Sequence, residues 1–410
     1  MKRLLIGIAG LAALVFVAVA IASSPPTFVR TWGTYGTGNG QFYGPYGIAV
    51  DTTGDVYVVD SFNSRVEEFT GSGGYLRQWG SAGSGDGQFS NPDGVAVNAS
   101  GDVYVTDEGN TRVEEFTATG GFIRKWGSVG TGPGQFAGAP HGISLDSSGN
   151  VYVADPTRDQ IDEYTGTGTY VREFGSPGTG TGQLNAPFGV SVDSSGDVYV
   201  ADSANDRIQE FTNAGAYVRQ WGSHGNGSGQ FYLPLDVKVD PAGNVYVVDT
   251  GNNRVEEFTS TGIYVTQWGS TGSGNGQFDG PGRIAFDAVG DIYVTDQPND
   301  RVEQFAYPGT LTATNKLVPS YDPGRFNLLV DGTVYAANVG NNGTTGGVSL
   351  LPGSHTVSET AATGTTLATY ATTVSCSNGQ SAIGASLAVQ VVGNAAVTCT
   401  FTNTRRIFRP

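Results

Sequence analysis

The sequence predicts an all-β protein: a six-bladed β-propeller followed by a small β-sandwich. The motif Tyr-Val-x-Asp recurs six times at intervals of 47 or 48 residues, ending at Asp60, Asp107, Asp155, Asp202, Asp249 and Asp296. Between these motifs lie short apolar runs separated by Gly-containing turns, and such a period is typical of propeller blades. From about residue 310 the repeat stops, and Thr, Val and Ala alternate as in sandwich strands.

One repeat can be interpreted as four antiparallel strands. In the first complete copy, apolar strands are expected at residues 48–51 and 56–60, joined by a tight turn containing Gly54. A third strand is expected at 65–69 and a fourth at 75–79, after a second Gly-rich turn. A Gly-x-Gly-x-Gly segment, expected to be a flexible connector, then leads to the Pro that opens the next copy.

The number of fourth strands predicts how the ring closes. A fourth-strand pattern at residues 28–32 precedes the first complete copy, and the last copy has no fourth strand of its own. We therefore expect residues 28–32 to supply the outer strand of blade six, which would leave no open edge between the first and last blades. This assignment makes residues 27–308 one propeller domain.

The first 26 residues resemble an export signal or a membrane anchor. A basic start, Met1-Lys2-Arg3, is followed by apolar residues from 4 to 22 and then by Ser-Ser-Pro-Pro. This order is typical of a secretory signal peptide. The run is also just long enough to span a bilayer, so an uncleaved N-terminal anchor is the alternative. Both interpretations place the rest of the chain outside the cell or on its surface.

Net charge limits the possible partners. The chain carries −16, and because residues 309–410 hold three acids and five bases, the remainder carries −18. A field of that sign repels phosphate backbones, so nucleic acid is not expected as a partner. We expect no cofactor, although Asn39, Asp86 or Asn275 in the Gly-rich connectors could assist Ca²⁺ binding. A monomer is expected, with possible membrane attachment through residues 4–22.

Residues that recur in every blade are interpreted as structural. The Asp that ends each Tyr-Val-x-Asp motif is followed five residues later by Arg in five copies, as in Asp60 and Arg65. One such pair would suggest a site, whereas five identical pairs indicate ion pairing within or between blades. The recurring Trp at the end of the fourth strand is expected to be core.

The ordered motifs Pro-x-Gly-[IV]-x-[VL]-Asp, Gly-[DN]-Val-Tyr-Val-x-Asp, Asn-x-Arg-[VI] and Trp-Gly-x-x-Gly resemble NHL repeats over about 280 residues. The resemblance implies a six-bladed propeller with a central channel. It says little about function, because members of that family range from protein and RNA binders to lyases. The basic face that RNA binding needs is not expected in so acidic a propeller.

Function is expected where the repeats differ, at the mouth of the channel. The variable residue within or just after Pro-x-Gly contributes two acids, one His, one Arg and two aromatics, and a symmetric structural need would not produce that variety. Blade three departs most from the pattern and adds a seventh candidate from its connector. The predicted ligand-binding residues are Tyr46, Asp93, His141, Arg158, Phe188, Asp236 and Arg283.

These residues predict binding of a protein, peptide or glycan. A propeller enzyme, either a lyase or a hydrolase using His141 with Asp93 or Asp236, is the alternative. The chain has three His in all, so the multi-His metal site of the propeller lyases it resembles cannot form, and no catalytic or metal-ligating residue is predicted. A purely structural envelope component is the third possibility.

Residues 309–405 form the predicted sandwich, with 406–410 as a tail. Cys376 and Cys399, the two cysteines of the chain, are expected to form a disulfide. Segments such as Pro323-Gly-Arg-Phe-Asn-Leu and Cys399-Thr-Phe-Thr-Asn-Thr resemble prealbumin-like, Cna B-type (SpaA-like) domains of bacterial surface proteins. The resemblance implies a possible internal isopeptide bond between Lys316 and Asn403, assisted by Glu359; the alternative is an ordinary surface lysine.

Overall fold

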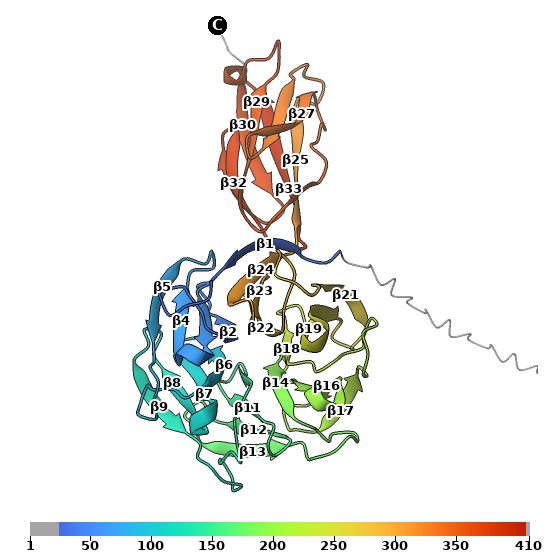
Figure 1. Ribbon diagram of the computed structural model, residues 1–410. Helices are drawn as coiled ribbons and strands as arrows, with labels where there is room; N and C mark the ends of the chain where they lie inside the picture. The colour runs from blue at the N-terminus through green and yellow to red at the C-terminus, as the bar shows by residue number, and fades with distance from the viewer. Residues whose placement is uncertain (1–23, 407–410) are drawn as a thin grey trace, which may run out of the picture.

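A computed structural model describes residues 24–406 and shows a ring of blades with an elongated sandwich projecting from its rim (Figure 1). The predicted signal or anchor at residues 4–22 lies outside the described residues. Among residues 24–406, no helix is both long enough and apolar enough to cross a membrane.

Six four-stranded sheets form the ring, as the repeat count predicts. Blade one contains β2 (Pro45–Val50), β3 (Val56–Asp60), β4 (Arg65–Phe69) and β5 (Tyr75–Trp79). Blade two contains β6 (Pro92–Val97), β7 (Val103–Asp107), β8 (Arg112–Phe116) and β9 (Phe122–Trp126). Blade three contains β10 (Ile143–Leu145), β11 (Val151–Asp155), β12 (Gln160–Tyr164) and β13 (Tyr170–Phe174).

The second half of the ring repeats this order. Blade four contains β14 (Pro187–Val192), β15 (Val198–Asp202), β16 (Arg207–Phe211) and β17 (Tyr217–Trp221). Blade five contains β18 (Asp236–Val239), β19 (Val245–Asp249), β20 (Arg254–Phe258) and β21 (Tyr264–Trp268). Blade six contains β22 (Pro281–Phe286), β23 (Asp291–Asp296) and β24 (Arg301–Ala306). Single 3₁₀ turns join the second and third strands of four blades: η1 (Ser61–Asn63), η2 (Glu108–Asn110), η3 (Ser203–Asn205) and η4 (Thr250–Asn252).

The outer strand of blade six comes from the other end of the domain. β1 (Thr27–Trp32) pairs antiparallel with β24, with Phe28 opposite Phe305 and Trp32 opposite Val302 (Figure 1). The first and last strands of the ring therefore share one sheet, and this pairing leaves no open edge at the junction.

Aromatic side chains pack the blades against one another. The ring of Trp79 in blade one lies 6.1 Å from that of Phe116 in blade two, and 6.0 Å from that of Tyr57 in its own blade. Gly120 turns over this indole with a φ of +82°, and a Cβ there would come within 2.8 Å of it. The turn therefore requires glycine both for its backbone conformation and for the close approach.

The repeated Asp and Arg residues fasten the connectors between blades. In blade two, Arg112 Nε lies 2.8 Å from Asp107 Oδ2, and its Nη2 donates to the carbonyls of Gly85 and Gln88. Asn110 donates to Gly83 of the same connector. The structure thus differs from the expected flexible connector, because the buried guanidinium and amide donors fix the backbone carbonyls of the Gly-rich segment.

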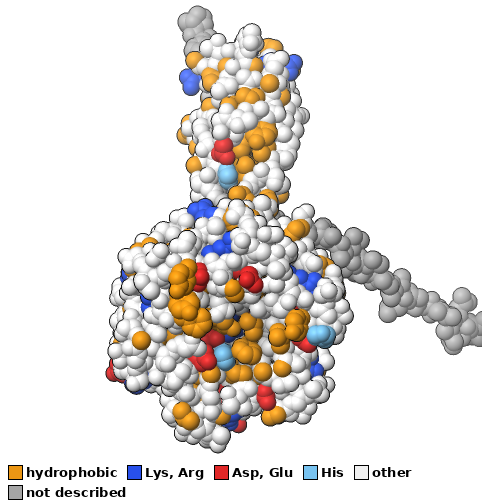
Figure 2. All heavy atoms as spheres, in the orientation of Figure 1, with side chains coloured by type: hydrophobic (Ala, Val, Ile, Leu, Met, Phe, Trp, Pro, Cys, Tyr) orange, Lys and Arg blue, Asp and Glu red, His pale blue; other side chains and the backbone are white. Residues whose placement is uncertain are grey.

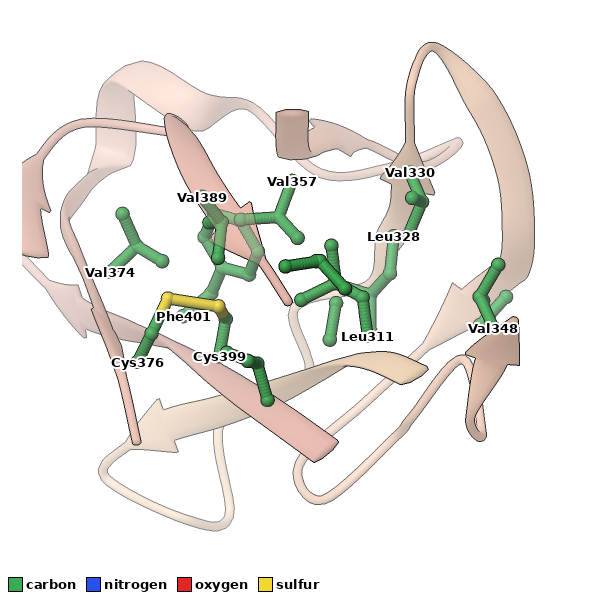
Figure 3. Packing of buried hydrophobic residues seen from close by; sticks show 14 residues of the cluster. Leu311, Leu328, Val330, Val348, Val357, Val374, Cys376, Val389, Cys399 and Phe401 are labelled. Carbon is green, nitrogen blue, oxygen red and sulfur yellow. A yellow bond between two sulfur atoms is a disulfide. The ribbon is translucent and has the colours of Figure 1, made fainter. Parts of the chain in front are cut away.

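Two sheets form the C-terminal sandwich. One has the order β28-β25-β33-β30-β31, and the other β27-β26-β29-β32. Their bounds are β25 (Gly309–Val318), β26 (Phe326–Val330), β27 (Thr333–Val339), β28 (Val348–Leu350), β29 (Gly353–Ala361), β30 (Tyr370–Cys376), β31 (Ser381–Ile383), β32 (Ser386–Val391) and β33 (Ala396–Arg405), with η5 (Leu367–Thr369) before β30. Figure 3 shows the apolar core between the sheets, with the disulfide Cys376–Cys399 linking β30 to β33.

The sandwich contacts blades five and six. Tyr307, just before β25, is buried among the aromatic side chains of these blades and donates a hydrogen bond to Glu257. The backbone amide of Gly393, in the turn between β32 and β33, lies 3.5 Å from the carbonyl oxygen of Val289. The junction between the two domains is therefore formed by side chains as well as by the connecting strand.

Candidate functional site

The innermost strand of each blade lines the central channel, and the residue after its Pro lies at one mouth. Four blades continue with glycine at the next position, at Gly47, Gly94, Gly142 and Gly189. These inner strands approach so closely that a Cβ on Gly47 would lie 2.3 Å from the carbonyl oxygen of Asp93. Blades five and six carry Asp236 and Arg283 at this position, so two charged side chains enter the channel there.

Arg283 is the centre of a buried network at this mouth. Its Nη2 lies 2.6 Å from Asp93 Oδ1, across the channel in blade two. Its Nη1 donates to the carbonyl of Leu235 at 2.8 Å and lies 3.5 Å from Asp236 Oδ1. The guanidinium carbon is 5.3 Å from the centre of the Tyr46 ring, within the range of a cation–π contact.

A histidine extends the network toward solvent. His141 Nδ1 lies 2.7 Å from Asp93 Oδ2, and its ring is 4.5 Å from that of Phe188. Glu108, on η2, also approaches this group. The network thus joins Tyr46, Asp93, His141, Phe188, Asp236 and Arg283, one residue from each of the six blades.

Burial and neighbouring charges determine the pKa values of the acidic groups in this network. Burial opposes ionisation of Asp93, but Arg283 and His141 outweigh it and lower the pKa of Asp93 to about 2. Burial raises the pKa of Asp236, against the opposing effect of Arg283. Burial and the neighbouring Asp93 raise the pKa of Glu108, which His141 partly offsets. The Arg283–Asp93 pair is therefore ionised at neutral pH.

Arg158 does not join this network. Its Nη2 lies 2.8 Å from Glu173 Oε2, and its Nη1 donates to the carbonyl of Gln135, both within blade three or its connector. It serves the connector much as the recurring arginines do in other blades. The structure therefore separates Arg158 from the other six predicted site residues, because its side chain fills the place of the missing arginine.

The connectors of blade one carry exposed aromatic side chains that were not among the predicted site residues. Tyr35 and Phe62 are 67% and 54% exposed, and both rings contact Tyr43, at 5.3 and 4.9 Å between centroids. Figure 2 shows apolar, acidic and histidine side chains gathered around the centre of the propeller face in view. The three aromatics, Tyr35, Tyr43 and Phe62, are called the aromatic patch below. Phe62 alone had a clear signal in the sequence, because the other five repeats have Gly, Thr, Ala or Pro at its position, whereas blade five has a tyrosine, Tyr232, at the position of Tyr43.

Asp93, Glu108 and His141 have potential metal-ligand atoms within 4.8 Å of one another. Both oxygens of Asp93 are already engaged, one by Arg283 and one by His141. A divalent ion would therefore have to displace the Asp93–His141 hydrogen bond to recruit three ligands. Of the Ca²⁺ candidates, Asp86 forms an ion pair with Lys125 at 2.7 Å.

The structure does not bring Lys316 to the other isopeptide candidates. Lys316 is exposed, because side chains alternate along β25 and its inward-facing neighbour is Asn315. Asn403 is fully buried and donates to Asn315 Oδ1 at 3.0 Å and to Glu359 Oε2 at 2.9 Å. Burial raises the pKa of Glu359 to about 7. An amide thus occupies the inward position where the isopeptide reaction would need a lysine amine.

The fold and the channel geometry define a six-bladed β-propeller joined to a β-sandwich. The NHL repeat family matches residues 42–69, 89–116, 184–211 and 231–258, within blades one, two, four and five. A family described as a prealbumin-like fold domain matches residues 325–405. The chain therefore contains NHL repeats in its propeller and a prealbumin-like domain at its C-terminal end.

Solved structures similar to this chain share its propeller. A protein of unknown function from Bacteroides thetaiotaomicron has a TM-score of 0.53 and 19% identity, covering 67% of this chain and 74% of its own. A streptogramin B lyase scores 0.49 with 17% identity, covering 67% and 96%. A gluconolactonase from Xanthomonas campestris scores 0.49 with 15% identity, covering 69% and 98%. At these identities the likeness concerns the fold alone, and no curated protein matches the chain.

Proposed function

We propose that this is an exported binding protein that holds a polypeptide ligand at the channel mouth formed by Tyr46, Asp93, His141 and Phe188. The observation that carries the proposal is the network in which six blades each contribute a different side chain. Blades that are otherwise near-identical need no such asymmetry to close a ring. A single, oriented binding surface does need it.

The aromatic patch supplies the contact area for this ligand. Three adjoining aromatic rings in solvent are unusual for a surface, since large apolar side chains normally gain by burial. Aromatic residues are enriched at the centres of protein interfaces, where a polar rim surrounds them. Here the half-buried His141 and Glu108 supply polar groups at the same mouth.

Export is supported by two features. A disulfide between Cys376 and Cys399 is of the kind that persists in oxidising compartments. The apolar run at residues 4–22 after a basic start has the composition of a signal or anchor. We therefore place the propeller outside the cell or on its surface, with the sandwich as a spacer or attachment module.

The experiment compares capture by the intact protein with capture by a triple variant, Tyr35→Ala, Tyr43→Ala, Phe62→Ala. Immobilised proteins are incubated with extracellular and envelope proteins of the producing cells, and a captured polypeptide is purified and titrated by calorimetry. The matched control is Tyr321→Ala, which removes an aromatic that is 86% exposed on the sandwich. We expect the triple variant to weaken binding at least about tenfold, as loss of interface anchors does, and the control to bind normally.

Three outcomes would contradict the proposal. Equal binding by the triple variant would show that the ligand binds at another surface. Binding of oligosaccharides on a glycan array, but of no polypeptide, would show that the ligand is a glycan. Absence of any saturable ligand in both assays would favour a purely structural envelope component.

A hydrolase or lyase at the same mouth is the second candidate, and one observation favours it. The Asp93–His141 hydrogen bond orients a half-buried imidazole, as a general base requires. This alternative would be established if the unaltered protein turned over a substrate and the His141→Gln variant did not, with the unfolding midpoint unchanged.

A further inference from the structure

A lysine enters the part of the channel that lies on the far side of the Arg283 network from the proposed binding face. This part is called the lower channel, and its opening the lower mouth. At its position in the inner strands the other blades have small residues: Ala49, Ala96, Ser144, Ser191 and Ala285. Lys238, on β18, is therefore the one long side chain of this layer. No packing requirement of a blade explains it, since five blades form the same layer without it.

The ammonium group of Lys238 lacks a partner in the structure. Its Nζ forms no hydrogen bond or ion pair with any of residues 24–406, although the side chain is only partly exposed. Burial, together with the charge of Arg283, lowers the pKa of Lys238, and Asp236 opposes that shift. Asp236 lies near Arg283 and forms no ion pair with Lys238, so the amine is available to an anion that enters from solvent.

Arg283 offers a second unsatisfied donor to the same space. Its Nε is buried and has no hydrogen-bond partner, whereas both Nη atoms are engaged by Asp93, Leu235 and Asp236. A cavity of about 20 Å³ is lined by Arg283, Lys238 and Asp236. That volume is enough for one water molecule. A water there can accept from Nε and donate to a ligand held by Lys238.

Below Lys238 the channel widens, and its walls carry both apolar and polar side chains. Lys238 also lines a hollow of about 190 Å³, whose walls include Val97, Leu145 and Val192. It lines a further hollow of about 490 Å³ at the lower mouth, bordered by Val50, Pro241 and Phe286. Together these spaces offer the cation of Lys238 at the inner end and apolar side chains, among them Val192, Pro241 and Phe286, between it and the opening.

The rim of the lower mouth restricts the charge that can enter. Asp51, Asp193, Asp240 and Asp287 border it, and each carboxylate accepts backbone N–H groups of its own hairpin. This acidic rim repels ligands with several negative charges. Among anions, a singly charged ligand is repelled least by this rim, and its one charge can pair with Lys238.

We propose that the lower channel binds a small monocarboxylate with an apolar body, its carboxylate on Lys238 Nζ and its hydrocarbon part against Val192, Pro241 and Phe286. The site lies on the opposite side of the Arg283 network from the aromatic patch, so it is independent of the proposed polypeptide ligand. Charge-assisted hydrogen bonding holds the head group, and burial of apolar surface holds the tail.

The test uses hexanoate as the probe and hexanamide as its uncharged match. The chain contains four lysines, Lys2, Lys125, Lys238 and Lys316, so reductive ¹³C-methylation gives few NMR signals, and Lys238→Met assigns one of them. We expect hexanoate to shift the Lys238 signal saturably and hexanamide to leave it unchanged. By calorimetry on unmethylated protein, Lys238→Met should lose at least about tenfold in hexanoate affinity, the loss expected for one charge-assisted hydrogen bond.

Lys316→Met, which removes an exposed lysine of the sandwich, is the matched control and should bind hexanoate normally. The triple variant of the aromatic patch should also bind hexanoate normally, which separates this site from the proposed polypeptide site. A Lys238 signal that responds no more than those of Lys125 and Lys316 would overturn the proposal. Unchanged affinity in Lys238→Met, or equal binding of hexanamide, would overturn it as well.

Discussion

Arg283 and Asp93 lie 190 residues apart in the chain, and Arg283 Nη2 approaches Asp93 Oδ1 to 2.6 Å across the propeller channel. They belong to blades six and two, which blade one separates. The pair therefore lies between the two mouths of the channel and connects blades that share no strand pairing. It also divides the molecule into an upper binding face and a lower cavity with Lys238.

Loss of this pair should destabilise the propeller strongly. Arg283→Met leaves Asp93 buried beside His141 with one charge-assisted bond fewer, and such losses cost about 3–5 kcal/mol. Adding Asp93→Asn to Arg283→Met removes the uncompensated charge, so the double variant should be more stable than Arg283→Met alone. Urea unfolding followed by tryptophan fluorescence measures this, and additive costs of the two changes would show that the residues do not interact.

Asp93 should also produce an acid limb in the stability profile. Its folded-state pKa of about 2 lies below the ordinary value of 3.8. The free energy of unfolding that it contributes is therefore fully present above about pH 4 and is lost as the pH falls toward 2. Unfolding midpoints measured between pH 5 and 2 should fall less steeply for Asp93→Asn than for the unaltered protein. Parallel curves would contradict the assignment.

Glu359 should give the sandwich the opposite dependence. Burial raises its pKa from 4.5 to about 7, so the stability it contributes is fully present below about pH 4.5 and is lost as the pH rises through 7. The total loss should be about 1–3 kcal/mol. Glu359→Gln, which keeps the shape without the charge, should remove this slope in calorimetric scans from pH 4.5 to 8. If Glu359→Gln kept the same dependence of stability on pH, that dependence would come from another group.

The mass of the sandwich should show a disulfide and no isopeptide bond. Lys316 is exposed while Asn403 is buried against Asn315 and Glu359, so the amine cannot reach the amide. After reduction and trypsin digestion, the peptide ending at Lys316 should appear unlinked. A cross-linked peptide lighter by about 17 Da, one ammonia per amide attack, would prove the geometry wrong. Lys316→Met should leave the unfolding temperature unchanged.

The arginines of blades two and three should differ in their contribution to stability. Arg112 is buried and bonds Asp107 and the connector carbonyls of Gly85 and Gln88, so Arg112→Met should cost about 3 kcal/mol. Arg158 pairs with the partly exposed Glu173 and lies 3.8 Å from the buried Asp162, so Arg158→Met should cost less than Arg112→Met. Equal unfolding midpoints for the two variants would contradict this ranking.

Much of the architecture was predictable because it is repeated. Six copies of the Tyr-Val-x-Asp motif predict six buried strands such as Val56–Asp60, and local patterning determines each of them. Five Asp–Arg pairs predict a structural role, which the clamp of Arg112 on its connector shows. The position of Lys316 was also readable, because Leu311, Ala313, Asn315 and Leu317 share the inward face of an alternating strand.

The candidate site was predictable only as a set of positions. Variation after each Pro located Tyr46, Asp93, His141, Phe188, Asp236 and Arg283, but not which of them touch. Lys238 was missed because a single lysine in an alternating strand looks like a solvent-facing residue. It is a channel residue because, in a propeller, the residues of the innermost strands that would face solvent in a lone sheet face the central channel instead.

By itself, the sequence determined the number of blades and the order of their strands, because both depend on local periodicity and turn chemistry. The tertiary structure alone decided that Arg283 bridges to Asp93, that Arg158 stays within blade three and that Lys238 faces the channel. Those relationships depend on distances across a closed ring, and closure brings together residues whose separation along the chain carries no local signal.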